Sequence, residues 1–161
     1  MRWLMTFTLA TLLGACSASA TRQGETPPIP RLSGPCAFLS RVEVADVTGS
    51  RVIKVERGIS KSTLEKAGCL YRTDGPYGAI VVGMDVTGIA RFQAWLEREA
   101  RPEAHNIVER VFGLGDEAYL IGRGSLSVRK GPVVFHVGTQ YLRLDGPAVL
   151  RALAEIALPR L

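Results

Sequence analysis

The sequence predicts an α+β fold, with an antiparallel sheet packed by a short N-terminal helix, a middle helix and a C-terminal helix. Two observations support this fold class. Short apolar runs separated by turn residues follow one another in residues 69–86 and 106–138, as strands and their turns do. Segments with helical periodicity bracket these runs instead of alternating with single strands, which favours an antiparallel sheet.

The first helix is predicted from a capping box. Ser40 is placed as the N-cap, and Glu43 reaches back to it from three residues further on. Leu39 and Val44 occupy the two positions of a hydrophobic staple across the helix start. We therefore expect a short helix over residues 41–47.

The next segment contains a second capping box, in residues 62–65 (Ser-Thr-Leu-Glu), which predicts a turn or two of helix ending at Gly68. Residues 69–72 and 78–86 are predicted to be strands. An Asp-Gly-Pro turn at residues 74–76 divides them.

The middle helix is expected over residues 88–101, because Pro102 ends it and four apolar residues recur on one face. Beside that face, Arg91, Trp95 and Arg98 lie in one row at helical spacing. A tryptophan between two arginines is suited to contact anionic headgroups, a glycan or a partner protein. The more common arrangement is that Trp95 packs on the sheet margin and the arginine stems cover it.

Four further strands are predicted: residues 106–112, 118–121, 125–129 and 133–138. The last two form a hairpin around Lys-Gly-Pro at 130–132. Their two-residue alternation directs one set of side chains to the core, namely Leu126, Val128, Phe135 and Val137. The same alternation turns His136 outward, where we expect a half-exposed surface residue.

The glycine-rich segment Gly-Leu-Gly-Asp at 113–116 could be mistaken for a phosphate cradle, but it lacks a third glycine and a following helix. We interpret its glycines as positive-φ positions in a turn, with Asp116 bonding its own backbone. The C-terminal helix is expected to begin at Asp-Gly-Pro 145–147. Its buried stripe is predicted to be Val149, Leu150, Leu153, Ile156 and Ala157.

The N-terminus resembles a bacterial lipoprotein signal peptide. An apolar run of about eleven residues follows Arg2 and leads through Leu-Leu-Gly-Ala into Cys16, whereas a bilayer span needs roughly 20. The resemblance implies cleavage before Cys16 and attachment of acyl chains to it. The alternative is ordinary secretory cleavage nearby, at Ala18 or Ala20.

The chain then divides into residues 1–15 as a signal peptide, 16–35 as the lipidated cysteine with a flexible tether, and 36–161 as a single α+β domain. The tether is rich in Ser, Thr, Gly and Pro and has no apolar period. We expect the domain in the cell envelope, on the outer face of the plasma membrane or the periplasmic side of an outer membrane.

With Cys16 assigned to lipid, Cys36 and Cys69 remain as one pair in an oxidising compartment, which favours a structural disulfide. A redox pair or a metal site is less consistent with the sequence, because there is no C-x-x-C motif and His105 and His136 lack ligand spacing. No metal or cofactor is expected.

Several short motifs also resemble a family of small bacterial lipoproteins of unknown function, known mainly from high-GC Gram-positive bacteria. The motifs are Pro-Cys-Ala-Phe-Leu at 35–39, Cys-Leu-Tyr at 69–71 and Val-Phe-Gly-Leu-Gly-Asp-Glu-Ala-Tyr at 111–119. Membership implies that the two domain cysteines pair, and it implies no particular activity.

Charge and motifs exclude some functions. Residues 36–161 carry 17 basic and 14 acidic residues, mixed along the chain, so the basic stripe of a nucleic-acid binder is missing. No G-x-S-x-G motif occurs, and His105 or His136 would need an acid and a nucleophile brought together in space. We expect a membrane-anchored, non-catalytic accessory protein that binds an envelope partner. The alternative is a carrier or sensor of a small apolar ligand or lipid held between sheet and helices.

Overall fold

The computed structural model describes residues 34–57, 67–85 and 89–161. The predicted signal peptide, Cys16 and most of the tether lie outside the described residues, as does the second capping box at 62–65. No helix in these three described ranges is both long and apolar enough to cross a membrane.

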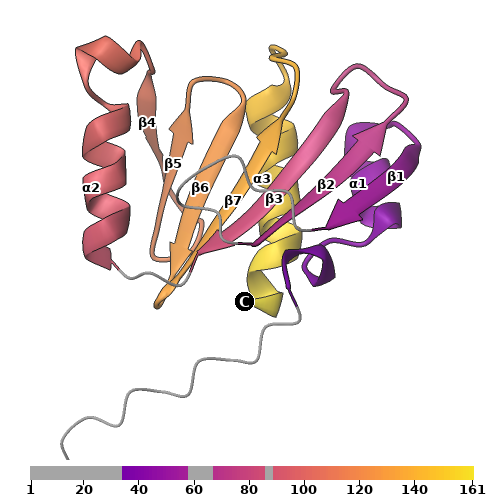
Figure 1. The fold of residues 1–161 in the computed structure, drawn as a ribbon, viewed down its shortest axis with the longest axis horizontal. Helices are drawn as coiled ribbons and strands as arrows, with labels where there is room; N and C mark the ends of the chain where they lie inside the picture. Colours follow the sequence, from indigo (N-terminus) through magenta and orange to yellow (C-terminus); the bar gives the residue numbers. More distant parts are fainter. Residues whose placement is uncertain (1–33, 58–66, 86–88) are drawn as a thin grey trace, which may run out of the picture.

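The described strands form one antiparallel sheet with the spatial order β1-β2-β3-β7-β6-β5-β4 (Figure 1). Together with the helices, this confirms the predicted α+β class. The strands are β1 (Val52–Arg57), β2 (Ala67–Thr73), β3 (Ala79–Asp85), β4 (Val108–Val111), β5 (Glu117–Ile121), β6 (Ser125–Lys130) and β7 (Val133–Thr139).

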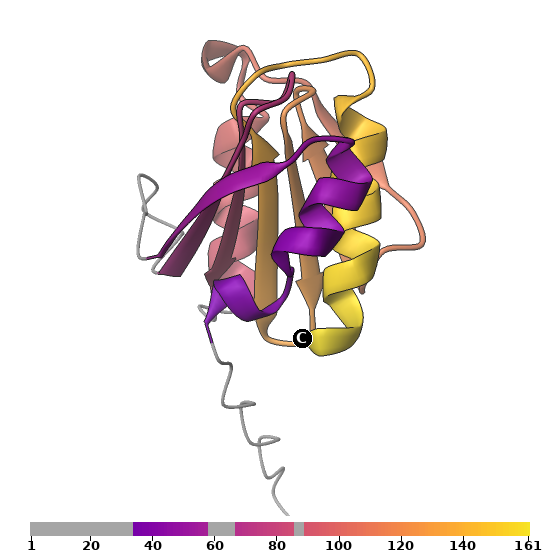
Figure 2. The same cartoon turned by 90° about the vertical axis from the view of Figure 1, so that its right-hand side faces the viewer.

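Helices lie on both faces of the sheet (Figure 2). α1 (Arg41–Thr48) and α3 (Gly146–Ala157) pack on one face, and α2 (Ile89–Glu99) packs on the other. Neighbouring residues of β7 show the division, because Phe135 belongs to the α1/α3 core and Val134 to the cluster under α2. Three short 3-10 turns complete the described elements: η1 (Pro35–Ala37), η2 (Pro102–Ala104) and η3 (Leu158–Arg160).

The first helix begins as its capping box predicts. The Ser40 hydroxyl accepts a hydrogen bond from the Glu43 N–H (3.2 Å), and the Glu43 carboxylate accepts one from the Ser40 N–H (2.8 Å). Gly49 ends the helix with φ 61°. Arg160, near the C-terminus, forms an ion pair with the same carboxylate. The end of the chain is therefore fastened to the start of α1.

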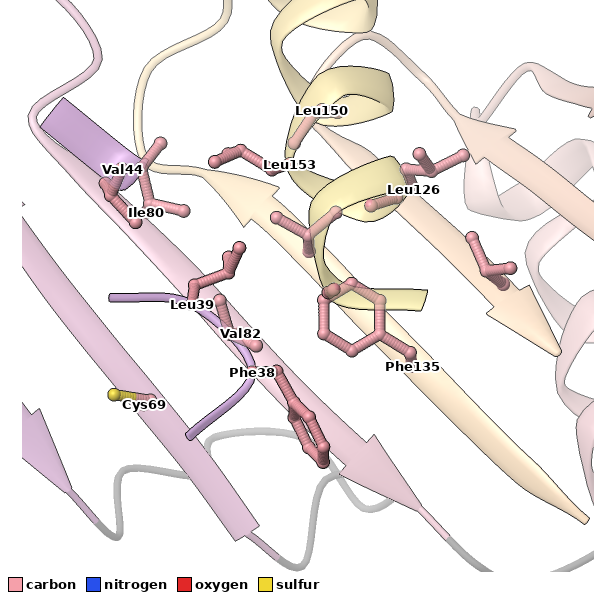
Figure 3. Close-up of a cluster of buried hydrophobic side chains, with 14 of the residues drawn as sticks. Phe38, Leu39, Val44, Cys69, Ile80, Val82, Leu126, Phe135, Leu150 and Leu153 are labelled. Atoms are coloured by element: carbon pink, nitrogen blue, oxygen red, sulfur yellow. The ribbon is translucent and has the colours of Figure 1, made fainter. Parts of the chain in front are cut away.

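The main core lies between the sheet and the helices α1 and α3 (Figure 3). All four hairpin residues predicted to point inward are buried in it. Of the α3 stripe, Leu150, Leu153 and Ala157 are fully buried, while Val149 and Ile156 are partly buried. Full burial of one such leucine contributes about 1.5–3 kcal/mol. Because this core contains many more buried apolar side chains than the cluster under α2, this face supplies most of the apolar stabilisation.

The predicted disulfide is confirmed. Cys36 and Cys69 are bonded, with their Cα atoms 5.1 Å apart and a sequence separation of 33. The bond joins η1 to β2. Beside it, the Tyr71 hydroxyl donates to the Leu39 carbonyl (2.5 Å), and burial raises the pKa of Tyr71 to about 12. The segment before α1 is thus held to the sheet covalently and by a hydrogen bond.

The turn between β4 and β5 corrects one detail of the sequence interpretation. Gly113 and Gly115 have φ 77° and 56°, as expected for this turn. The Asp116 carboxylate, however, accepts hydrogen bonds from the Gly131 N–H (2.7 Å) and the Arg129 guanidinium (2.8 Å), not from its own turn. Antiparallel pairing of β5 with β6 brings Asp116 beside the β6–β7 turn, where the better donors lie.

Candidate functional site

The row Arg91, Trp95 and Arg98 lies on α2. Both arginines are exposed, whereas Trp95 is half-buried. Its ring stacks on Phe92 (centroids 5.8 Å apart) and meets the His136 ring edge to face (5.4 Å). Trp95 is therefore part of the contact between α2 and the sheet, and a partner contact by this row stays a prediction.

His136 differs from its predicted environment. It does point away from the main core, but only 5% of its surface is exposed, because α2 covers that face. The Ser127 hydroxyl, which is fully buried, lies 2.7 Å from His136 Nδ1. Ser127 and His136 face each other directly in the β6–β7 pairing. The expectation of a half-exposed histidine was wrong because a strand alternation does not reveal a second covering helix.

Asp85 lies on the same face of the sheet as His136. In the β3–β7 pairing Gly83 faces His136 and Asp85 faces Val134, so the carboxylate is one diagonal step away. Asp85 is only 2% exposed. Its Oδ2 and the His136 Nε2 are both buried without a hydrogen-bond partner among the described residues. Asp85, Ser127 and His136 thus form a group of buried polar residues on the face of the sheet that α2 packs against.

The charge state of this cluster follows from its burial. Removal of the imidazole from water lowers the pKa of His136 to about 4, against the opposing attraction of Asp85. His136 is therefore neutral at physiological pH. A serine, a histidine and an aspartate are the residue types of a hydrolytic triad. Here the serine hydroxyl is enclosed, so the arrangement as it stands holds a neutral imidazole and offers no nucleophile to a substrate.

His105 lies in a different part of the fold. It follows η2 with φ 54°, is exposed, and its Nδ1 lies 2.7 Å from the Pro102 carbonyl oxygen. Among the described residues no group of three or more His, Cys, Asp and Glu side chains is placed to hold a metal ion.

A groove runs between α3 and the strands β4 and β5, which we call the α3–β4 groove. It consists of two hollows of about 250 and 360 Å³ that share Leu120 and Pro147. The smaller hollow is almost entirely apolar. The residues lining the two hollows are Ile107, Glu109, Val111, Leu120, Gly122, Arg123, Leu126, Leu144, Pro147, Ala148 and Arg151.

Four large apolar side chains at one end of this groove are exposed to solvent. We call them the distal apolar patch: Ile107, Tyr141, Leu142 and Leu144. Leu144 is 86% exposed and shares a hollow with Ile107, which is 67% exposed. Leu142, 73% exposed, and Leu144 line a third hollow beside them. Ile107, Leu144 and Leu142 are joined through these hollows, and Tyr141 is the residue before Leu142 in the chain.

The patch lies at a defined end of the domain. Three of its residues belong to the connection between β7 and α3, at the top of Figure 1. The C-terminus and η1, where the described chain begins, lie at the opposite end. Sequence reasoning did not find this patch, because Leu142 and Leu144 precede a predicted helix and carry no periodicity that marks them as exposed.

The buried cluster was also missed, although a signal for it exists. Five consecutive residues of β7, Val133 to Val137, are buried, and a run without polar alternation is typical of a strand covered on both faces. Comparisons of the chain with models of protein families, with curated proteins and with solved structures found no match.

Proposed function

We propose that this chain is a lipid-anchored protein of the cell envelope, related to the small bacterial lipoproteins that it resembles, which acts without catalysis by binding a partner protein. The observation that carries the proposal is the distal apolar patch with its adjoining groove. Residues 1–15 would serve as the signal peptide and Cys16 as the lipid attachment site, because Leu-Gly-Ala leads directly into this cysteine.

The exposure of the patch supports a binding role. Scattered apolar side chains are common on soluble proteins, whereas a contiguous group is typical of an interaction site. Three of its residues, Ile107, Leu142 and Leu144, line adjoining hollows. Covering this surface stabilises a complex by about 25 cal/mol for each Å² of apolar area removed from water.

The position of the patch supports a protein partner over a lipid one. A tether from Cys16 would join the domain at the end where η1 lies, and the patch is at the other end (Figure 1). With that end toward the membrane, the patch faces the envelope space. The Cys36–Cys69 disulfide is in keeping with such a compartment, since disulfides persist in oxidising surroundings.

The proposal is tested by photocrosslinking in the envelope of the native host. A photoreactive residue in place of Leu144 should give one discrete adduct, since this side chain is 86% exposed within the patch. The same residue at the exposed position Glu97 on α2 is the matched control and should not give that adduct. Adding Ile107→Glu should weaken the adduct at position 144. Equal adducts from both positions, or none from 144, would contradict the proposal.

A carrier function is the second candidate, supported by the apolar hollow of about 250 Å³ between α3 and the sheet. Pockets for small molecules are of about 300–1,000 Å³, so this hollow fits a fragment of a ligand better than a whole lipid. Native mass spectrometry of the exported chain decides between the two. A mass that is lost on denaturation supports the carrier, and an unloaded chain supports the binding protein.

A further inference from the structure

We infer that the partner presents an extended, acidic segment that adds as a strand to the free edge of β4, with alternate side chains facing the α3–β4 groove. This inference rests on the proposed function and specifies the chemistry of the partner. Three independent features carry it: the backbone of β4, the groove beside that strand, and the charges around both.

The backbone of β4 has a free edge. β4 is the last strand in the sheet order and pairs with β5 within the described part of the chain. The Ile107 carbonyl accepts a hydrogen bond from the Gly122 N–H (2.7 Å), which identifies this pair as a hydrogen-bonded one. By the alternation of antiparallel strands, Val108 and Arg110 then turn their N–H and C=O groups away from β5. Such an edge is a template for another strand.

The groove lies on the α3 side of the same strand. Ile107, Glu109 and Val111 alternate toward it, and their neighbours across the groove are Pro147 and Ala148 on α3. Every second side chain of an added strand would face this side. Because the groove is largely apolar there, we expect apolar residues at those positions of the partner.

The charges around β4 favour an acidic partner. Arg143 pairs with Asp145 (3.3 Å) and Arg151 pairs with Glu155 (2.9 Å). Arg110 lies over the ring of Phe112, 5.3 Å from its centre, and neither Arg110 nor Arg123 forms an ion pair with another described residue. Glu109 contributes one acidic group to the groove. Arg110 and Arg123 against Glu109 leave an excess of one positive charge beside β4, and carboxylates on an added strand would be attracted to it.

The edge strand itself is short and ends in exposed apolar residues. It has four residues, and Ile107 and Phe112, which flank it, are 67% and 74% exposed. Natural proteins commonly protect free edges with charges or by covering them. Glu109 and Arg110 are of opposite sign, so two copies paired along β4 would meet no net like-charge repulsion from them. Self-association through β4 is therefore an outcome that the test must separate.

The test uses the exported chain, purified in detergent, and a fluorescein-labelled heptapeptide of alternating valine and glutamate. Binding is measured by fluorescence polarisation. A valine–lysine peptide of the same length should bind at least tenfold more weakly. Two further peptides carry N-methyl groups on alternate amides, either all on valine or all on glutamate. Only one set of amides can face β4, so one of the two should lose at least tenfold in affinity and the other should bind nearly as the parent.

Protein variants provide the matching comparison. Arg110→Pro removes an N–H that points away from β5, and Arg110→Ala removes the same charge but keeps that N–H. The proline variant should bind the peptide at least tenfold more weakly than the alanine variant. If the proline variant does not fold, as judged by circular dichroism, the N-methylated peptides still decide the question.

The outcomes separate this inference from the proposed function. Equal binding of the two N-methylated peptides, or no binding of the acidic peptide, would overturn strand addition while the crosslink from position 144 could persist. Stronger binding of the lysine peptide would overturn the acidic partner. A dimer in light scattering that Arg110→Pro abolishes would mean that a second copy occupies the edge, which also overturns the inference. If position 144 gives no crosslink and the acidic peptide does not bind, both proposals are overturned.

Discussion

The Ser127 hydroxyl and the His136 imidazole lie 2.7 Å apart on adjacent strands, enclosed between the sheet and α2. The contact occupies Nδ1 and leaves Nε2 buried without a hydrogen-bond partner in the described structure. A protonated ring would carry a second donor into that apolar space. The stability of the α2 face is therefore tied to the charge of one histidine.

Acidification should destabilise the domain through His136. The folded-state pKa is about 4, below the ordinary value of 6.5, so the unfolded chain takes up a proton first as the pH falls. The stability that neutral His136 gives the folded domain is fully present above pH 6.5. The free energy of unfolding then declines as the pH falls toward 4, by about 3 kcal/mol for a pKa shift of this size. Urea unfolding at several pH values measures it. His136→Gln should flatten the dependence in this window, and His105→Gln, at an exposed site, should leave it unchanged.

Removal of the disulfide should lower the free energy of unfolding by about 3–4 kcal/mol, since the bond closes a loop of 33 positions in sequence. Urea unfolding of the oxidised chain and of the Cys36→Ala, Cys69→Ala double variant measures the difference. The fully denatured mass of the exported chain checks the bond directly. Two free thiols in that spectrum would contradict the Cys36–Cys69 pairing in the mature protein.

Loss of the capping box should weaken α1. Ser40→Ala removes the acceptor for the Glu43 N–H, and we expect a loss of about 1 kcal/mol in unfolding free energy. Asp46→Asn, at an exposed position of the same helix, is the control and should change stability by less than about 0.5 kcal/mol. Equal effects of the two variants would show that the cap has no special role.

Truncation of two leucines, one within α3 and one just before it, should affect the stability of the domain very differently. Leu153 is fully buried, so Leu153→Ala should destabilise the domain by about 2–5 kcal/mol. Leu144 is 86% exposed, so Leu144→Ala should leave stability within about 0.5 kcal/mol of the parent and should weaken partner binding. Thermal unfolding and the crosslinking assay measure the two effects separately. A large loss of stability in Leu144→Ala would mean that the patch belongs to the fold rather than to an interface.

Local chemistry explains which parts of the fold the sequence predicts well. The start of α1 depends on residues 40–44, the hairpin turn on residues 130–132, and the start of α3 on residues 145–147, so each signal lies within one stretch of chain. The alternation within β6 and β7 likewise predicts which side chains reach the main core. The pairing of Cys36 with Cys69 is predicted from the expected oxidising compartment and from the assignment of Cys16 to lipid, which leaves two cysteines.

The features that sequence reasoning missed depend on contacts between distant elements. The burial of His136 requires α2 to lie over β7, and the apolar run in β7 indicates cover on both faces without specifying which element supplies it. The strand β1 is a mostly exposed edge with a register shift between Val52 and Lys54, so its alternation is weak. The α3–β4 groove exists because α3 packs over β6 and β7 and leaves part of β4 and β5 uncovered, which is a matter of layer geometry.

The disulfide also has a mechanical consequence. A pull that reaches the domain through the residues before Gly34 meets Cys36 two positions later, and the covalent bond passes that load to Cys69 in β2. β2 is hydrogen-bonded on both sides, to β1 and to β3, so the load is shared by an interior strand. α1 lies beyond the bond and is spared. A pulling force applied from the N-terminal side can therefore act on the domain without detaching α1 from the sheet.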